Sequence, residues 1–145
     1  MFEMKRFRFL EHTADAYVEA YGVSLEDAFG NAAAAMTDVM TELETVNAVE
    51  EESFLVEAQD EPALLYSWLE ELLLEFELKG KLYSRFEVSD IEKTSDGFRL
   101  HAKAWGEPYD SVKHPSKVGI KAATYHQMEI LKEPGSVVVR FILDI

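Results

Sequence analysis

The chain has 145 residues, no cysteine and a formal net charge of −14 at pH 7. A chain of this length fits one domain, 1–145, which buries about two-thirds of the surface that its unfolded form exposes. The lack of cysteine excludes disulfides, thiolate metal sites and cysteine nucleophiles. Any functional site must therefore use oxygen and nitrogen ligands.

The charge also limits the partners that the chain can bind directly. Affinity for nucleic acid depends on Lys and Arg side chains that neutralise phosphates, so we expect no strong independent binding of nucleic acid. A strongly acidic protein instead attracts divalent cations or a basic protein surface. No apolar run reaches the ~18 residues of a membrane span, and no secretory leader pattern is present. We predict a cytoplasmic protein without a membrane partner.

The first half of the chain alternates between strand and helix patterns. Residues 16–21 alternate in polarity and predict a half-buried strand, and residues 53–57, which follow an acidic start at Glu50, predict another. Apolar residues at helical spacing predict helices over about 25–43 and 61–79. The second helix places seven apolar side chains on one arc and so predicts the centre of the core: Leu64, Leu65, Trp68, Leu69, Leu72, Leu73 and Phe76.

Two leucines of the second predicted helix do not fit its apolar arc. Leu74 and Leu78 fall on the opposite side, near Ser67 and Glu71. Either another element covers them or they face a partner; isolated apolar residues at the surface are also common.

The remainder of the chain is rich in strand patterns. Its alternating runs predict five strands, at 86–91, 98–105, 118–125, 128–131 and 137–144. Asp96-Gly97 supplies the positive φ that a tight hairpin turn needs. A polar loop, 106–115, has too little periodicity for the core, and loops of this kind often carry function.

Two aspartates at opposite ends of the sequence are placed for chemistry. Asp15 stands at the mouth of the strand 16–21, and Asp144 closes the last predicted strand on its partly polar face. For Asp15 the structural alternative is a turn in which Asp15 and Thr13 accept hydrogen bonds from nearby backbone N–H groups.

Five motifs occur in order along the chain: His12-Thr13-Ala14-Asp15, Trp68-Leu69-Glu70-Glu71-Leu72, Gly106-Glu107, Lys121-Ala122-Ala123-Thr124-Tyr125-His126 and Asp144-Ile145. Each motif alone is weak, but five in register are specific. Together they resemble the archease family, whose members assist the GTP-dependent tRNA-splicing RNA ligase. The resemblance spans nearly the whole chain.

The resemblance implies a fold and a metal site. The fold is α+β: mixed or antiparallel β-sheets packed with the two main helices in a single domain. The implied cofactor is a divalent metal, commonly calcium, held by the carboxylates of Asp15 and Asp144 and a main-chain oxygen of Ile145. Such oxygen donors suit a hard cation. Because Ile145 is the last residue here, we expect its α-carboxylate, with a reference pKa of about 3.3 to 3.7, to add a third negative group.

The resemblance also implies an activity without catalysis by this chain. The ligase joins an RNA end that bears a 2′,3′-cyclic or 3′ phosphate to a 5′ hydroxyl, and archease promotes guanylylation of the ligase and its multiple turnover in tRNA splicing and RNA repair. The ligase is thus the implied partner.

Six further residues are candidates for contact with the partner or for support of the metal: His12, Glu107, Asp110, His114, Lys121 and His126. Four of them have a structural alternative. His12 can instead orient Asp15 or close a turn. His114 and His126 can be ordinary surface or capping groups, and a solvated Lys121 is the commoner outcome.

The chain departs from the family pattern at two positions. Gln127 follows Tyr125-His126 where the pattern has Gly, and Gly119 precedes Ile120-Lys121. Both departures fall in the stretch expected to contact a partner, and neither touches the metal pair.

Two other functions are compatible with parts of the pattern. A metal-dependent phosphoester hydrolase would use the same cation to activate water, but only two side-chain carboxylates are proposed, and no His-x-x-x-His or Ser-His-Asp arrangement can be recognised. A general chaperone would be supported only by the acidity and by Leu74 and Leu78.

Overall fold

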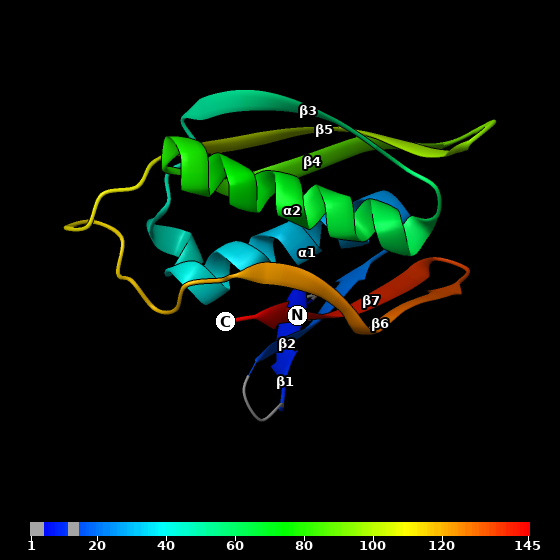
Figure 1. The fold of residues 1–145 in the computed structure, drawn as a ribbon, viewed down its shortest axis with the longest axis horizontal. Coiled ribbons are helices and arrows are strands. Elements are labelled where there is room, and N and C mark those ends of the chain that lie inside the picture. Colours follow the sequence, from blue (N-terminus) through cyan, green and yellow to red (C-terminus); the bar gives the residue numbers. More distant parts are fainter. Residues whose placement is uncertain (1–4, 12–14) are drawn as a thin grey trace.

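Two helices lie between two antiparallel sheets in the computed structural model (Figure 1), which describes residues 5–11 and 15–145. Both helices contact both sheets, so the core fills the space between them. This arrangement confirms the expected α+β fold with antiparallel sheets and two main helices. His12 and Thr13 lie outside the described residues. Within the described part of the chain, no helix is long and apolar enough to cross a membrane.

The larger sheet has four strands, in the order β1-β2-β7-β6. Its strands are β1 (Phe7–Leu10), β2 (Ala16–Gly22), β6 (Ala122–Glu133) and β7 (Ser136–Asp144), and all neighbours are antiparallel. Strand β7 therefore lies between β2 and β6. Its alternate residues Val137, Val139, Phe141 and Leu143 are buried against the helices, as period two predicts.

The smaller sheet has three strands, in the order β3-β5-β4. They are β3 (Glu50–Ala58), β4 (Lys81–Thr94) and β5 (Gly97–Pro108). The hairpin between β4 and β5 turns at Ser95-Asp96, and Gly97 has a φ of 153°, a value that only Gly adopts readily. The predicted hairpin is thus confirmed.

Helix α1 (Leu25–Met40) begins at Ser24, whose Oγ accepts a hydrogen bond from the Asp27 N–H at 3.1 Å. The helix ends three residues before the predicted boundary at 43. Thr41 has an extended backbone, and the Asp38 carboxylate accepts a hydrogen bond from the Leu43 N–H at 3.0 Å. This side-chain bond competes with the helical one and leads the chain into a short 3₁₀ helix, η1 (Leu43–Thr45).

Helix α2 (Glu61–Lys79) has the bounds that the sequence predicts. Asp60 caps its start by accepting from the Ala63 N–H at 2.8 Å, and Gly80 ends it in a left-handed conformation with a φ of 64°. The predicted apolar arc is buried except for Phe76, which is half-buried. At the centre of the core, the fully buried Trp68 donates its indole N–H to the carbonyl of Phe29 at 3.1 Å.

The segment between β5 and β7 differs from the sequence-based expectation. Strand β5 continues to Pro108, so the irregular segment covers 109–121 rather than 106–115. The strands expected at 118–125 and 128–131 form a single strand, β6, with an irregularity between Thr124 and Glu129. Gln127 lies inside that irregularity and has a φ of 55°, the conformation that favours Gly.

Candidate functional site

The register of the larger sheet brings the two predicted aspartates to one corner. Ala16 in β2 pairs with Leu143 in β7, and extending this antiparallel register by one residue sets Asp15 across from Asp144. On the other side of β7, the Lys121 N–H donates to the carbonyl of Asp144 at 2.7 Å. The corner thus gathers Asp15, Asp144, Ile145 and the backbone of Lys121 from distant parts of the sequence.

The donors at this corner are oxygen atoms. Asp144 and Ile145 are both half-buried, and Asp144 belongs to the face of β7 that points away from the helices. Two carboxylates and a main-chain oxygen fit the oxygen preference of Ca²⁺, which completes six to eight positions with water. The donor chemistry of these residues therefore fits the implied metal.

A buried glutamate on the same outer face ties three strands together. Glu19 of β2 accepts hydrogen bonds from the Nε of Arg8 in β1 and the Nε of Arg140 in β7, both at 2.6 Å, and from the Tyr21 hydroxyl. Burial would raise the pKa of Glu19, but these hydrogen bonds lower it to about 2. Burial and the bond to Glu19 raise the pKa of Tyr21 to about 12.

Sequence reasoning did not single out this cluster. The available signal was Glu19 itself, since this carboxylate lies in the middle of β2 on the same period-two face as Asp15, the residue just before the strand. Ion pairing of Glu19 with strands on both sides holds the outer face of the sheet beside the aspartate corner.

Three predicted residues are joined by hydrogen bonds where β5 ends: Glu107 in the strand, and Asp110 and His114 in the segment that follows it. His114 is fully buried, which fits neither the partner contact for which it is a candidate nor the surface position given as its alternative. Its Nδ1 accepts from the Asp110 N–H at 2.9 Å, so Nδ1 carries no proton and Nε2 donates to Glu107 at 2.8 Å. His114 is therefore a neutral imidazole that organises the chain around it.

Glu107 accepts two further hydrogen bonds. The Lys113 ammonium lies 2.6 Å from one carboxylate oxygen, and the Asn47 N–H donates at 2.9 Å. Burial would raise the pKa of Glu107, but its hydrogen bonds, led by the one from Lys113, lower the pKa to about 2. The charged Glu107 thus anchors the 109–121 segment to β5 and to the residues before β3.

Lys121 and His126 are exposed, as a contact with a partner requires. His126 lies next to Gln127 in the irregular part of β6. The preceding residue, Tyr125, stacks on Tyr66 of α2 with ring centroids 4.5 Å apart. This stacking fixes the irregular part of β6 against the helix.

The structure also gathers three titratable side chains that the sequence did not indicate. Asp90, Glu92 and His101 lie on the outer face of the smaller sheet, with one ligand atom from each within 4.8 Å of the others. Glu92 is engaged by Arg99 at 3.2 Å and lies 3.6 Å from His101. The signal that could have found them is strand pairing, because Asp90 stands opposite His101 across β4 and β5. The cluster forms part of an exposed ion-pair network.

A model of the archease protein family matches residues 7–145. The chain belongs to the archease family. The archeases of Pyrococcus abyssi and Sulfurisphaera tokodaii are 44% identical over 143 residues and 39% identical over 142 residues, respectively. Each match covers 98% of this chain and 100% of the relative. The resemblance drawn from five motifs is therefore confirmed at the level of the family.

Solved structures agree with archease-family membership. The solution structure of Methanobacterium thermoautotrophicum protein 1598 is 40% identical, with a TM-score of 0.82, and covers 98% of this chain and 100% of that one. The crystal structure of a Thermotoga maritima protein, named as an archease and possible chaperone, is 18% identical, with a TM-score of 0.55 over 100% of both chains. The second similarity shows the fold alone.

Proposed function

We propose that this archease-family protein is a non-catalytic, metal-binding activator of the GTP-dependent tRNA-splicing RNA ligase. It acts in the cytoplasm by promoting guanylylation of the ligase and hence multiple turnover in tRNA splicing and RNA repair. The observation that carries the proposal is the corner of the larger sheet in a chain of the archease family: Asp15 directly precedes Ala16 and Asp144 directly follows Leu143, and Ala16 pairs with Leu143.

The proposed metal ligands are the Asp15 and Asp144 carboxylates and a main-chain oxygen of Ile145. A bound calcium ion would supply positive charge that neutralises these oxygens and can attract an anionic group of the ligase complex. The ladder between β2 and β7 ends at Ala16 and Leu143, next to the two aspartates, and the Lys121 N–H donates to the Asp144 carbonyl. The Lys121 side chain is exposed and lines a hollow along α2.

Two of the described histidines are not placed to serve a phosphoester hydrolase at the aspartate corner; His12 lies outside the described residues. A hydrolase needs a base or acid within reach of the metal-bound water. His114 is buried and donates to Glu107, while His101 lies on the smaller sheet. Neither histidine is presented at the corner formed by Asp15 and Asp144.

The test is a ligation assay with the ligase, GTP and two RNA ends, one with a 2′,3′-cyclic phosphate and one with a 5′ hydroxyl. We expect multiple turnovers with the wild-type protein, where the ligase alone stalls, and faster labelling of the ligase by GTP. Asp15→Ala and Asp144→Ala should abolish both effects. Glu51→Ala, an exposed residue on the smaller sheet, is the matched control and should activate normally. Unchanged ligase turnover with the wild-type protein would refute the proposal.

A further inference from the structure

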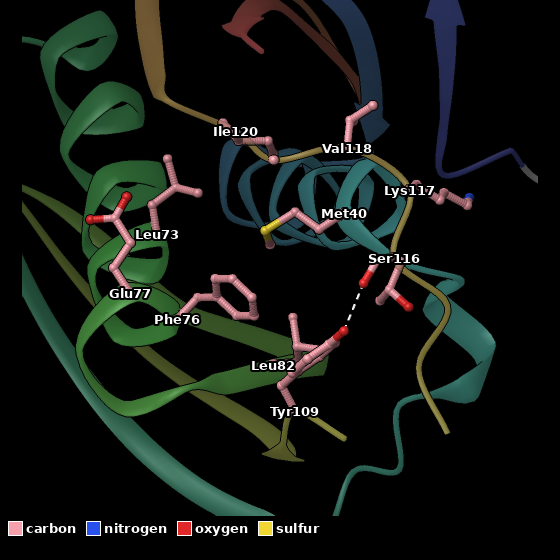
Figure 2. Close-up of a pocket in the computed structure, with 12 residues that line it drawn as sticks. Met40, Leu73, Phe76, Glu77, Leu82, Tyr109, Ser116, Lys117, Val118 and Ile120 are labelled. Atoms are coloured by element: carbon pink, nitrogen blue, oxygen red, sulfur yellow. Dashed lines mark hydrogen bonds between the residues drawn. The ribbon is translucent and has the colours of Figure 1, made fainter. Parts of the chain in front are cut away.

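A pocket of about 340 Å³ opens between the end of α1, the second half of α2 and the 109–121 segment. Figure 2 shows the side chains of Met40, Leu73, Phe76 and Ile120 surrounding a common space. The Tyr109 hydroxyl and the Ser116 hydroxyl share a hydrogen bond of 2.6 Å at one side of the pocket. The walls are mainly apolar, and the volume is at the small end of the range for ligand sites, about 300 to 1,000 Å³.

One polar group in the pocket wall has no partner. Thr41 is 1% exposed, and its hydroxyl is the one buried side-chain atom among the described residues without a hydrogen bond. Buried hydroxyls are normally paired because water is no longer available to them. An unpaired hydroxyl in an apolar wall indicates a site whose missing hydrogen bond comes from an occupant.

A second hollow, of about 440 Å³, adjoins the pocket on α2 and shares Leu73 and Glu77 with it. Its lining also includes Glu70, Glu71 and Lys121. Glu71 and Glu77 are exposed and form no ion pair within the described part of the chain. This hollow is therefore acidic along α2 and reaches the residue whose backbone bonds to Asp144.

Apolar side chains are exposed along the same stretch of α2. Leu74, which lines the acidic hollow, is 44% exposed, and Leu78 is 74% exposed. These are the two leucines that the helical pattern set apart. No other described element covers them, so the stretch offers apolar surface next to unpaired carboxylates.

We propose that the pocket and the acidic hollow form one docking groove for a segment of the ligase that presents an apolar anchor side chain flanked by Lys or Arg. This inference rests on the proposed function and names the partner's chemistry. The anchor fills the space between Met40, Phe76 and Ile120, and the cationic flank pairs with Glu71 and Glu77. Interfaces commonly concentrate their binding energy in one such anchored residue.

Charge complementarity decides between this occupant and the others. A second copy of this chain would bring another acidic surface against Glu71 and Glu77, because the net charge is −14. Lys117 at the pocket rim does not offset the carboxylates of the groove, since it already pairs with Glu42 at 3.2 Å and donates to the Asp38 carbonyl at 2.9 Å. A basic protein segment with an apolar anchor can bind both parts of the groove, because the anchor fits the apolar pocket and the basic side chains fit the acidic hollow.

The test measures the affinity of the intact ligase for three variants by biolayer interferometry. Glu77→Lys should weaken binding about tenfold at low salt, with a smaller effect at high salt, because it places repulsive charge in the groove. Glu51→Lys makes the same charge change on the smaller sheet and should bind like the wild type. Thr41→Val should weaken binding about fivefold, as expected for a lost hydrogen bond, while it raises the melting temperature of the free protein.

The results separate the two proposals. If the wild type activates the ligase but Glu77→Lys and Thr41→Val bind as tightly as the wild type, the docking groove is refuted and the activator function stands. If the wild type neither binds nor activates the ligase, both proposals fail. If Glu77→Lys loses affinity while Asp144→Ala binds normally but does not activate, the groove is supported as a docking site separate from the metal corner.

Discussion

Replacing Glu107 by Gln tests how the 109–121 segment is held. Gln keeps the shape of Glu and can still accept from the Asn47 N–H and from His114, but it presents an amide NH₂ to Lys113. Loss of the Lys113 pair contributes about 0 to 1 kcal/mol because that lysine is partly exposed. The hydrogen bonds from the Asn47 N–H and from His114 remain, but they are weaker when the acceptor is neutral. Together they then stabilise the fold by about 1 kcal/mol less, or slightly more than that. We expect Glu107→Gln to lower the free energy of unfolding by about 1 to 2 kcal/mol at pH 7.

The pH dependence gives this prediction a distinctive sign. The pKa of folded Glu107 is about 2, below its reference value of 4.5. The charged carboxylate therefore stabilises the fold fully above pH 4.5, and this stabilisation is lost as the pH falls from 4.5 towards 2. The difference in unfolding free energy between the wild type and Glu107→Gln should accordingly shrink as the pH approaches 2.

Urea unfolding at neutral pH and near pH 3 measures this difference. At neutral pH we expect a lower transition midpoint for Glu107→Gln and a melting temperature reduced by about 4 to 8 °C. Glu51→Gln removes the same charge from an exposed position and should not change either value. If Glu107→Gln lowers the free energy of unfolding by the same amount at both pH values, the stabilising role of the charged Glu107 carboxylate is refuted.

Three further changes test the rest of the fold. Gln127→Gly should raise the unfolding free energy by about 0.5 to 1 kcal/mol because the φ of 55° strains any residue with a Cβ; a lower melting temperature would contradict this. Glu19→Gln should destabilise the protein by about 1 to 3 kcal/mol at pH 7, since the amide keeps an acceptor oxygen for only one of the two arginines and turns an NH₂ donor towards the other. Urea titrations should show this loss of unfolding free energy shrinking below pH 4.5. Trp68→Phe should cost about 2 kcal/mol through a cavity and the lost bond to the Phe29 carbonyl; an unchanged urea midpoint would contradict that packing.

The helix boundaries show what local patterns can and cannot predict. Helix α2 was predicted correctly because Asp60 and Gly80 mark its ends with their own side-chain and backbone chemistry. The end of α1 was placed too late because Leu43 continues the helical spacing. The hydrogen bond that the Leu43 N–H donates to the Asp38 carboxylate ends the helix. This bond does not change the spacing of the apolar residues, so the spacing could not reveal it.

Residues whose role depends on tertiary contacts were harder to predict. The burial of His114 follows from its bonds to Glu107 and Asp110, which sequence spacing cannot show. The single strand β6 was expected as two strands because the irregularity at Gln127 interrupts the alternation. The family pattern contained a hint, since a Gly expected at Gln127 matches the positive φ observed there.

The prediction that Asp15 and Asp144 form one site depended more on the resemblance to archeases than on the spacing of residues in the sequence. Alternation placed Asp15 and Asp144 at strand ends, but no local pattern pairs residues so far apart along the chain. The ladder of β2 against β7 ends at the pair Ala16–Leu143, directly beside both aspartates, which is compatible with a shared cation. Occupancy of the corner by a metal remains a prediction.

Titration calorimetry with calcium chloride tests that central claim most directly. The account predicts one site in the wild-type protein, with affinity reduced at least about tenfold in Asp15→Asn and Asp144→Asn, because each loses a charged oxygen ligand. Glu51→Gln should bind calcium like the wild type. Equal calcium affinity in the wild type and both aspartate variants would contradict the account.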